Sequence, residues 1–308
     1  MSRDAQIRMA AVEHVGRIAV SDVLTSEQLR AGFQFEGRRI PLINPQRGIF
    51  KPAEMTSLLS IRTVYPKTGA RIWYDDQRRV HEQIERGDEL IDYAFMGTDP
   101  AAPDNRWLRE AWETQTPILY FLGVAPTRYM KIWPTYIAEW RPFELKVQLA
   151  FSSISDTSES KVIWGVSEPP ARRYSFQLIR QRLHQATFRE AVLTAYNNRC
   201  AISGLPEPRL LDAAHIIADG HIDLGQPVVP NGLPMSKIHH AAFDANLIGI
   251  DPDFRIHVSK ALMSIDDGPM LEYGFKEIAG RTIRLPGRPR DYPDRDRLAE
   301  RFERFMGR

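Results

Sequence analysis

The segment NGLPMSKIHHAAFDANLIGI, residues 231–250, carries two adjacent histidines and an aspartate among mostly apolar residues. Its early proline is suited to the first turn of a helix, and we predict a helix over residues 234–247. Residues four apart on a helix share one face, with their Cβ atoms about 6 Å apart. His240 and Asp244 can therefore bind one divalent cation. His239 points about 100° away around the helix axis and cannot share that role.

A third histidine precedes this helix. The run LLDAAHII is typical of a strand that ends near His215, PVV at residues 227–229 is predicted as a second strand, and Asn231 with the next glycine turns the chain. The hairpin brings His215 opposite the helix, where its imidazole can take a proton from a water that attacks phosphorus. Its ordinary pKa, about 6.5, leaves it mostly neutral at physiological pH. Asn231 is suited to hold the loop that aims His215.

Strand, strand and helix with His, Asn and His in this order resemble the HNH endonuclease family, in the branch with the motifs CxxC/S, AAHI, NGL and HHxxFD. The resemblance covers about residues 175–260. It implies a ββα-metal site that nicks or cuts DNA with Mg²⁺ or Mn²⁺, with Co²⁺ or Ni²⁺ as alternatives. It also implies His215 as general base, Asn231 as the family's asparagine and His240 as a catalytic metal ligand. Asp244 lies where many members have a second helical ligand.

The sequence departs from the family pattern at a structural zinc site. Many relatives bind zinc with two CxxC pairs, but the matching positions here are Cys200, Ser203, Ser236 and His239. Serine hydroxyls do not replace thiolates as zinc ligands. We therefore expect no structural zinc, and we interpret Cys200 as a small buried side chain.

A second departure concerns the metal ligands. The position before the general base is commonly Asp or His in the family, whereas this chain has Ala214. The nearest carboxylate is Asp212, three residues before His215. Asp212 is therefore a candidate either for the missing metal ligand or for a group that orients the site.

The chain changes character near residue 160. All six tryptophans lie at or before Trp164, whereas five of the eight histidines lie between His215 and His257. Runs such as ILYFLGVA and YMKIWPTYIAEW are typical of strands, and NRWLREAWE and QRRVHEQIERG of helices. The stretch FSSISDTSES followed by VSEPPARR is typical of a linker. We predict an α+β protein with a β-rich domain at residues 1–155, a linker at 156–173 and the nuclease domain at 174–308.

The first domain, over about residues 8–150, is similar to the SRA-like readers of the PUA superfamily that precede HNH domains in restriction proteins. The similarity lies in EGRRIPLINPQRGIFKPAEM, IWYDD and ILYFLGVAPTRYMKIWPTYI. It implies that a modified cytosine, 5-methyl or 5-hydroxymethyl, is flipped out and held between aromatic rings, with a carboxylate on its amine. The candidates are Trp73, Tyr74, Asp75 and Asp76. The alternative is that the aromatic pair is core and the aspartates cap a turn.

Positive charge is concentrated before the nuclease motif. Residues 172–199 contain six arginines and a single acid, Glu190. The run YSFQLIRQRLHQATFREAVLTAYNN has the apolar spacing of an amphipathic helix. We expect four arginines, two just before this run and two within it, to contact the DNA backbone: Arg172, Arg173, Arg180 and Arg182. A solvated helix face rich in arginine is the alternative.

Composition and charge limit where the protein is expected to act and what it is expected to bind. The net charge is +2, no apolar run approaches the about 18 residues that span a bilayer, and the first residues lack a signal-peptide pattern. We expect a cytoplasmic protein without a membrane partner. Double-strand cutting by a site that cuts one strand would need a homodimer.

Three functions stay open. The first is a modification-dependent restriction endonuclease that acts on double-stranded DNA with modified cytosine. The second is an HNH nuclease whose first domain recognises another DNA modification, RNA or a protein partner. The third is a catalytically dead DNA-binding module, for which Ala214 is the only hint in the sequence.

Overall fold

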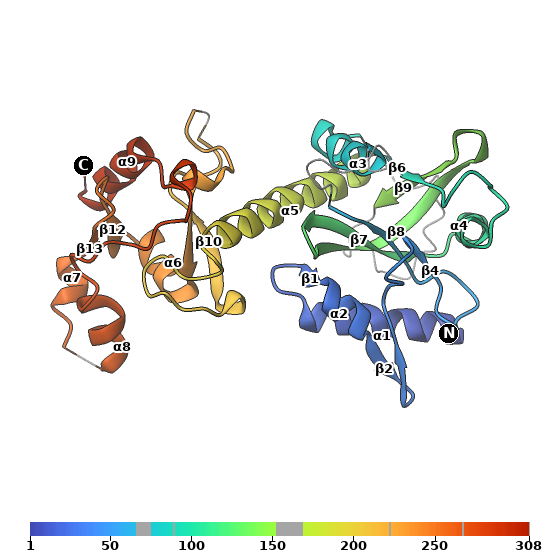
Figure 1. The fold of residues 1–308 in the computed structure, drawn as a ribbon, viewed down its shortest axis with the longest axis horizontal. Coiled ribbons are helices and arrows are strands. Elements are labelled where there is room, and N and C mark those ends of the chain that lie inside the picture. The colour runs from blue at the N-terminus through green and yellow to red at the C-terminus, as the bar shows by residue number, and fades with distance from the viewer. Residues whose placement is uncertain (66–74, 89, 152–168, 222, 267, 308) are drawn as a thin grey trace. The chain divides into compact units, whose positions relative to one another are not determined.

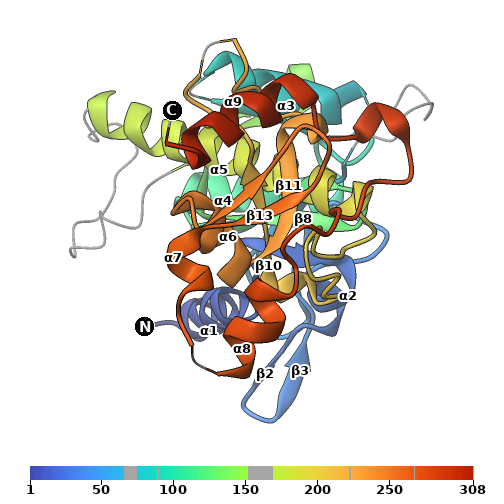
Figure 2. The same ribbon diagram turned by 90° about the vertical axis from the view of Figure 1, so that its left-hand side faces the viewer.

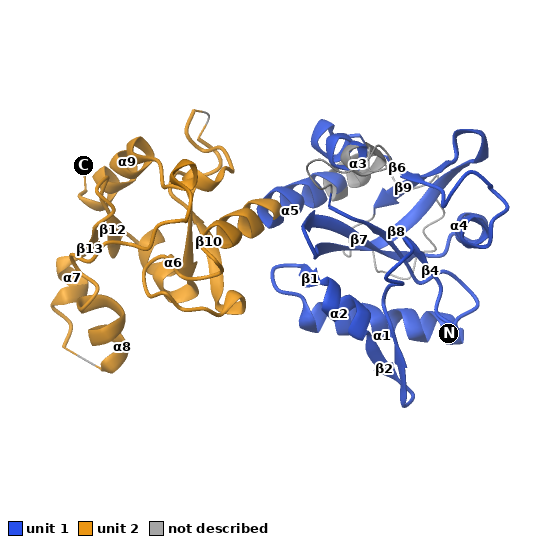
Figure 3. Ribbon diagram, in the orientation of Figure 1, with its two compact units in different colours: residues 1–186 blue, residues 187–308 orange. Residues whose placement is uncertain are grey.

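The computed structural model describes residues 1–65, 75–88, 90–151, 169–221, 223–266 and 268–307. The chain forms two compact units, residues 1–186 and residues 187–308 (Figure 3). Both units combine helices with β-structure, so the predicted α+β class is confirmed. In the described part of the chain, no helix is long and apolar enough to cross a membrane.

Unit 1 is built on a mixed seven-stranded sheet (Figure 1). Its strands are β1 (Val23–Thr25), β4 (Ile49–Phe50), β5 (Ser60–Thr63), β6 (Ile91–Ala94), β7 (Ile118–Ala125), β8 (Arg128–Arg141) and β9 (Lys146–Phe151). The order is β4-β5-β7-β8-β9-β6, with β1 paired to β8. Only the β5–β7 pair is parallel among these described pairs. A separate hairpin joins β2 (Phe33–Phe35) to β3 (Arg38–Ile40).

Helices cover both faces of this sheet. They are α1 (Arg3–Ile18), α2 (Ser26–Ala31), α3 (Asp75–Arg86) and α4 (Pro103–Thr114), with the first part of α5 (Pro169–Ala195). Strand β7 is apolar at nearly every position because its two faces enter different cores. Tyr120 and Leu122 pack with α3, α4 and α5, whereas Leu119 and Phe121 pack with α1 and α2. The strands and helices predicted from ILYFLGVA, YMKIWPTYIAEW and NRWLREAWE are confirmed as β7, β8 and α4.

Unit 2 contains a two-stranded sheet with a helix beside it (Figure 2). These elements are β10 (Leu211–His215), β11 (Gly232–Ser236) and α6 (Lys237–Asp244). The remaining elements are β12 (Ile248–Ile250), β13 (Ile256–Val258), α7 (Lys260–Met263), α8 (Pro269–Leu271), the π-helical turn Glu272–Lys276 and α9 (Arg295–Phe305). Short 3-10 turns lie at Pro208–Leu210, Val229–Asn231 and Pro289–Asp291.

Two local predictions were wrong in their bounds. The second strand is β11, not residues 227–229, and the helix begins at Lys237 rather than at residue 234. Pro234 lies within β11, opposite Ala213, and its carbonyl accepts a hydrogen bond from Ala201 N–H at 2.6 Å. The helix starts later because the Ser236 hydroxyl caps it, accepting from His239 N–H at 3.3 Å.

Helix α5 contributes to both units. Phe176, Ile179 and Leu183 lie in a core of unit 1, whereas Phe188 and Val192 lie in the main core of unit 2. The apolar spacing predicted for the C-terminal half of this helix is therefore confirmed. The expected nuclease domain starts at residue 174, whereas the compact unit that contains the ββα elements starts at Thr187. The expected linker at 156–173 lies outside the described residues up to 168, and its last five residues begin α5.

Candidate active site

His215 is the last residue of β10, and strand pairing places it opposite Gly232. Its imidazole stacks on the ring of Phe188 from α5, with centroids 4.1 Å apart and an interplanar angle of 14°. Gly232 makes this contact feasible, because a Cβ there would lie 2.8 Å from Phe188 Cζ and 2.4 Å from Val192 Cγ2. The absence of a side chain at Gly232 thus lets α5 approach the strand pair and orient the His215 ring.

Asn231 holds the loop that follows His215. Its Oδ1 accepts from Ile217 N–H at 2.9 Å, and its Nδ2 donates to Ile217 O at 3.0 Å and Gln226 O at 3.1 Å. Its own carbonyl accepts from Ile216 N–H at 2.9 Å. The side chain is fully buried. Asn231 therefore makes a dense set of bonds directly beside His215, as the loop-holding role expected from the sequence requires.

The carboxylates of Asp212 and Asp244 flank the His240 imidazole. His240 Nδ1 lies 3.6 Å from Asp212 Oδ2, and His240 Nε2 lies 3.3 Å from Asp244 Oδ2. A histidine binds a metal through one nitrogen, and the two carboxylates lie beside different nitrogens of this ring. Only one of the two carboxylates can therefore share an ion with His240 in this arrangement. In the described residues, no group of three or more His, Cys, Asp or Glu side chains forms a metal site.

The spacing on the helical side nevertheless fits two ligands of one cation. Donors that each lie about 2.1 Å from an ion are about 3 to 3.5 Å apart, which matches the 3.3 Å between His240 Nε2 and Asp244 Oδ2. Asp212 then faces the second nitrogen of the ring. A carboxylate in that position fixes the tautomer and orientation of a ligand histidine. Of the two roles considered for Asp212, the geometry favours the orienting one.

Burial and nearby charges tune His215. Burial lowers the pKa of the imidazole below its ordinary value, and His240 lowers it further, whereas Asp219 and Asp244 oppose the shift. His215 is therefore neutral at pH 7 and available as a base. Within the described residues, its Nε2 is shielded from solvent and has no hydrogen-bond partner. The same side chain is partly exposed, so solvent reaches it from another side.

The four positions that correspond to a zinc site in relatives form a different cluster here. Cys200 Sγ accepts from the N–H groups of Ser203 at 3.4 Å and Ser236 at 3.3 Å, and lies 3.6 Å from His239 Nδ1. His239 Nε2 donates to Gly274 O at 2.9 Å. Burial raises the pKa of the Cys200 thiol, but the bonds from His239, Ser203 and Ser236 outweigh it and lower that pKa to about 6. Cys200 is fully buried, as expected, and it is paired with His239 as well.

This pairing predicts a pH-dependent contribution to stability. The folded thiol has a pKa of about 6, whereas an unfolded cysteine has one of about 8.5, so the thiolate favours the folded state above its folded pKa and loses that effect below it. The loss in free energy of unfolding caused by Cys200→Ser should grow from pH 5 to pH 7, by at most about 1.4 kcal/mol per pH unit. Urea unfolding of both proteins across this range measures the difference, and a constant difference would contradict the prediction.

A second prediction concerns Gly232. Because its Cβ would clash with Val192 and Phe188, Gly232→Ala should lower the free energy of unfolding by about 1–3 kcal/mol and slow cleavage by displacing the ring under His215. Gly287→Ala is the matched control, since a Cβ there meets no atom of the described residues within 4 Å. Thermal melts and cleavage rates of both variants test this. Equal melting temperatures and cleavage rates of the two variants would show that Gly232 does not limit how closely α5 packs on the strand pair.

The structure describes some of the remaining site candidates and not others. Trp73 and Tyr74 lie outside the described residues, and Asp75 and Asp76 are the first two residues of α3. The backbones of Arg172 and Arg173 belong to α5. Arg180 is exposed, and so is Arg182, which lies 3.8 Å from Asp22.

Another arginine of the same stretch is structural. Arg189 is buried, pairs with Glu190 at 2.8 Å and donates to the carbonyls of Pro208 and Leu211. The basic stretch is therefore not a uniform DNA-facing surface.

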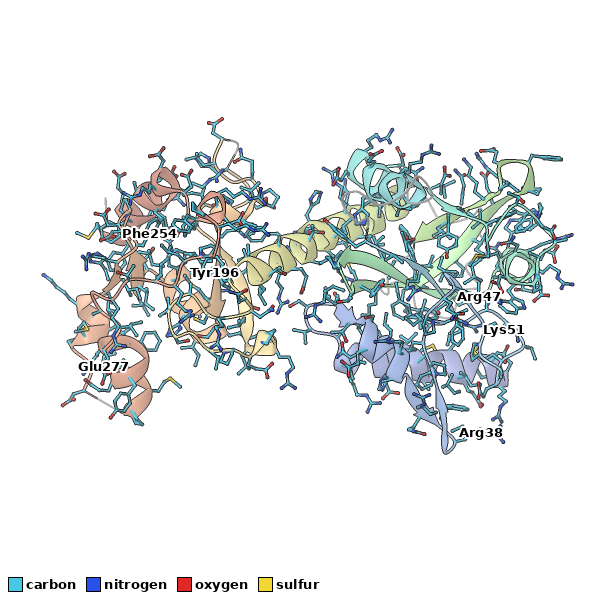
Figure 4. The ribbon with its side chains drawn as sticks, viewed as in Figure 1. Arg38, Arg47, Lys51, Tyr196, Phe254 and Glu277 are labelled. Atoms are coloured by element: carbon cyan, nitrogen blue, oxygen red, sulfur yellow. The ribbon has the colours of Figure 1, made fainter. Side chains whose placement is uncertain are left out.

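Sequence reasoning also missed Phe188, although its place in the apolar spacing of α5 marked it as buried. Tyr196, labelled in Figure 4, belongs to the same core and follows α5 directly.

Comparison with known proteins identifies the unit that holds these side chains. Residues 200–251 match the family model described as HNH endonuclease, and this segment contains His215, Asn231, His240 and Asp244. No curated protein matches the sequence significantly. A solved structure titled "Modification dependent TagI restriction endonuclease" aligns over 84% of this chain and 85% of its own, at 17% identity and a TM-score of 0.32. The chain therefore contains an HNH endonuclease segment at residues 200–251.

Proposed function

We propose that the HNH domain hydrolyses phosphodiester bonds of double-stranded DNA and that unit 1 selects DNA carrying a modified cytosine. The observation that supports the first half is the position of His215 beside His240 and Asp244, close enough for both to act on its pKa. A neutral histidine next to two donors of a divalent cation is the arrangement that metal-assisted hydrolysis requires.

His215 acts as general base in this proposal. Because Nε2 is shielded from solvent, we assign Nδ1 as the nitrogen that takes the proton from the attacking water. The water oxygen forms a bond to phosphorus, a bond from phosphorus to a sugar oxygen breaks, and the leaving oxygen takes a proton from solvent. The stacked ring of Phe188 and the loop bonded to Asn231 hold the imidazole for this transfer.

HNH nucleases generally use a divalent metal, and the residues of this site suit one. His240 Nε2 and Asp244 would hold the ion, with Asp212 orienting the His240 ring. Such an ion stabilises negative charge on the phosphate and the leaving oxygen. Mg²⁺ and Mn²⁺ suit a site with few protein donors, because water and phosphate oxygens complete their coordination. Ala214 leaves the position before His215 without a ligand.

Unit 1 is the proposed reader of modified cytosine. Its support is the resemblance of its sequence to SRA-like readers and the fact that it has cores of its own around a separate sheet. The proposed contacts to the flipped base are Trp73, Tyr74, Asp75 and Asp76, and exposed Arg180 and Arg182 would contact the phosphate backbone together with Arg172 and Arg173. Because one HNH site cuts one strand, cutting of both strands would use a homodimer.

The test compares three otherwise identical DNA duplexes that carry cytosine, 5-methylcytosine or 5-hydroxymethylcytosine, each with Mg²⁺ or Mn²⁺. The proteins are the wild type, His215→Ala and His184→Ala, the last a histidine of α5 outside the proposed site. Cutting confined to a modified duplex and lost only in His215→Ala is the expected result. Equal cutting of all three duplexes would overturn the reader assignment but keep the nuclease. Binding without cutting by the wild type would leave a dead DNA-binding module.

A further inference from the structure

Helix α9 lies outside the segment that matches the HNH family model, yet one of its arginines reaches α6. Arg301 is 9% exposed. Its two terminal nitrogens donate to Phe243 O and Asn246 Oδ1, and its guanidinium lies 4.5 Å from the centroid of the Phe243 ring. The next residue after Phe243 is Asp244, the proposed metal ligand. Arg301 therefore contacts α6 at the end that carries the site.

The C-terminal end of α6 needs such a partner for two physical reasons. The helix has only eight residues, and helices this short are marginal unless other parts of the fold hold them. Its last carbonyls lack partners within the helix. In addition, the Asp244 carboxylate lies at the negative end of the helix dipole, where an anion is unfavourable. The Phe243 carbonyl also accepts from Asn246 N–H at 3.1 Å, so the guanidinium adds a second, charged donor there. Its positive charge offsets the negative end of the helix dipole and the Asp244 carboxylate.

Arginine is suited to this position in a way that lysine is not. Its planar fork can donate to Phe243 O and Asn246 Oδ1 at once while it stacks on the Phe243 ring. Asn246 is held at φ +54°, in the left-handed conformation that follows a helix end. The fork therefore fixes the two residues on either side of the turn that closes α6.

We propose that Arg301 is a positioning residue of the HNH site, which fixes the C-terminal end of α6 so that Asp244 stays within reach of the cation bound by His240. This inference rests on the proposed nuclease function.

A second arginine of α9 serves the other half of the site. Arg297 donates to Leu224 O at 2.8 Å and to Gln226 Oε1 at 2.6 Å, and the carbonyl of Gln226 accepts from Asn231 Nδ2. Arg297 thus contacts the loop beside His215, not α6.

The test measures Mn²⁺ binding by the full chain without DNA, from the electron paramagnetic resonance signal of free Mn²⁺. Arg301→Ala and Arg301→Lys are compared with Arg304→Ala, an arginine of the same helix whose partner at 2.6 Å is Glu300 within α9. Loss of a group that orients a metal ligand weakens binding by about 10–100-fold. We expect that loss in Arg301→Ala, a smaller one in Arg301→Lys, and wild-type binding in Arg304→Ala. Arg297→Ala should slow cleavage at saturating Mn²⁺ and leave the Mn²⁺ affinity unchanged.

Asp244→Ala separates this inference from the proposed function. If the wild type binds Mn²⁺ through Asp244 and cuts DNA, but folded Arg301 variants bind Mn²⁺ as tightly as the wild type, only the positioning role is overturned. If the wild type neither binds Mn²⁺ nor cuts, the proposed function falls and the positioning role with it. Thermal melts identify variants that fail to fold. Should Arg301→Ala be unfolded, Arg301→Lys decides, together with Asn246→Gly. The latter removes the side-chain partner of the arginine, leaves the Phe243 carbonyl in place and keeps the left-handed turn.

Discussion

Replacing His215 with alanine should reduce the rate of DNA cleavage by about 10²–10⁴-fold, the usual contribution of a general base. The folded state should survive, because His215 is partly exposed and no hydrogen bond from its ring is seen among the described residues. Mn²⁺ binding should also be unchanged, since the proposed ligands are His240 and Asp244. Single-turnover cleavage at saturating Mn²⁺, together with a thermal melt, measures these effects. A loss below about tenfold would mean that another group activates the water.

The pH profile of the wild type provides an independent check on His215. Burial lowers its pKa, with a further lowering by His240, so the base is neutral and active at pH values below the ordinary histidine range. The cleavage rate should therefore stay constant as the pH falls past about 6.5 and decline tenfold per pH unit only below the lowered pKa. Matched assays at fixed Mn²⁺ between pH 5 and pH 8 locate this limb. A midpoint above 6.5 would contradict the role of burial at His215.

Replacing His240 with alanine should have the second large effect. The change removes a proposed ligand and leaves Asp212 and Asp244 without the ring that lies between them. We expect Mn²⁺ binding to weaken by more than the about 10–100-fold that follows the loss of an orienting group, with cleavage lost in parallel at low Mn²⁺. Titration with Mn²⁺ by the same resonance assay measures the affinity.

Asp212→Asn provides the comparison, since it keeps the size of the side chain and removes its charge. If Asp212 orients His240, as the geometry favours, this variant should lose about 10–100-fold in affinity, less than Asp244→Ala. An equal or greater loss would make Asp212 a ligand in its own right. It would then replace the group that is missing at Ala214.

Local sequence patterns predicted the parts of the site that depend on neighbours in the chain. The four-residue spacing of His240 and Asp244 places both on α6, and the Nε2–Oδ2 distance of 3.3 Å follows from that spacing. Asn231 was predicted to hold the loop after His215, and its bonds to Ile217 do so. The boundary between strand and helix was misplaced because Pro234 is acceptable both at a helix start and in a short strand. The capping hydroxyl of Ser236 decides between them.

By itself the sequence determined the α+β class and the HNH segment, because both depend on residue types at short spacings along the chain. Only the tertiary structure decided the orienting position of Asp212, the stacking of Phe188 on His215 and the contact of Arg301 with α6. Arg301 and Phe243 are 58 residues apart, and Asp212 and His240 come from different elements. Such contacts arise when separate elements share one core, and no periodicity within a single element encodes them.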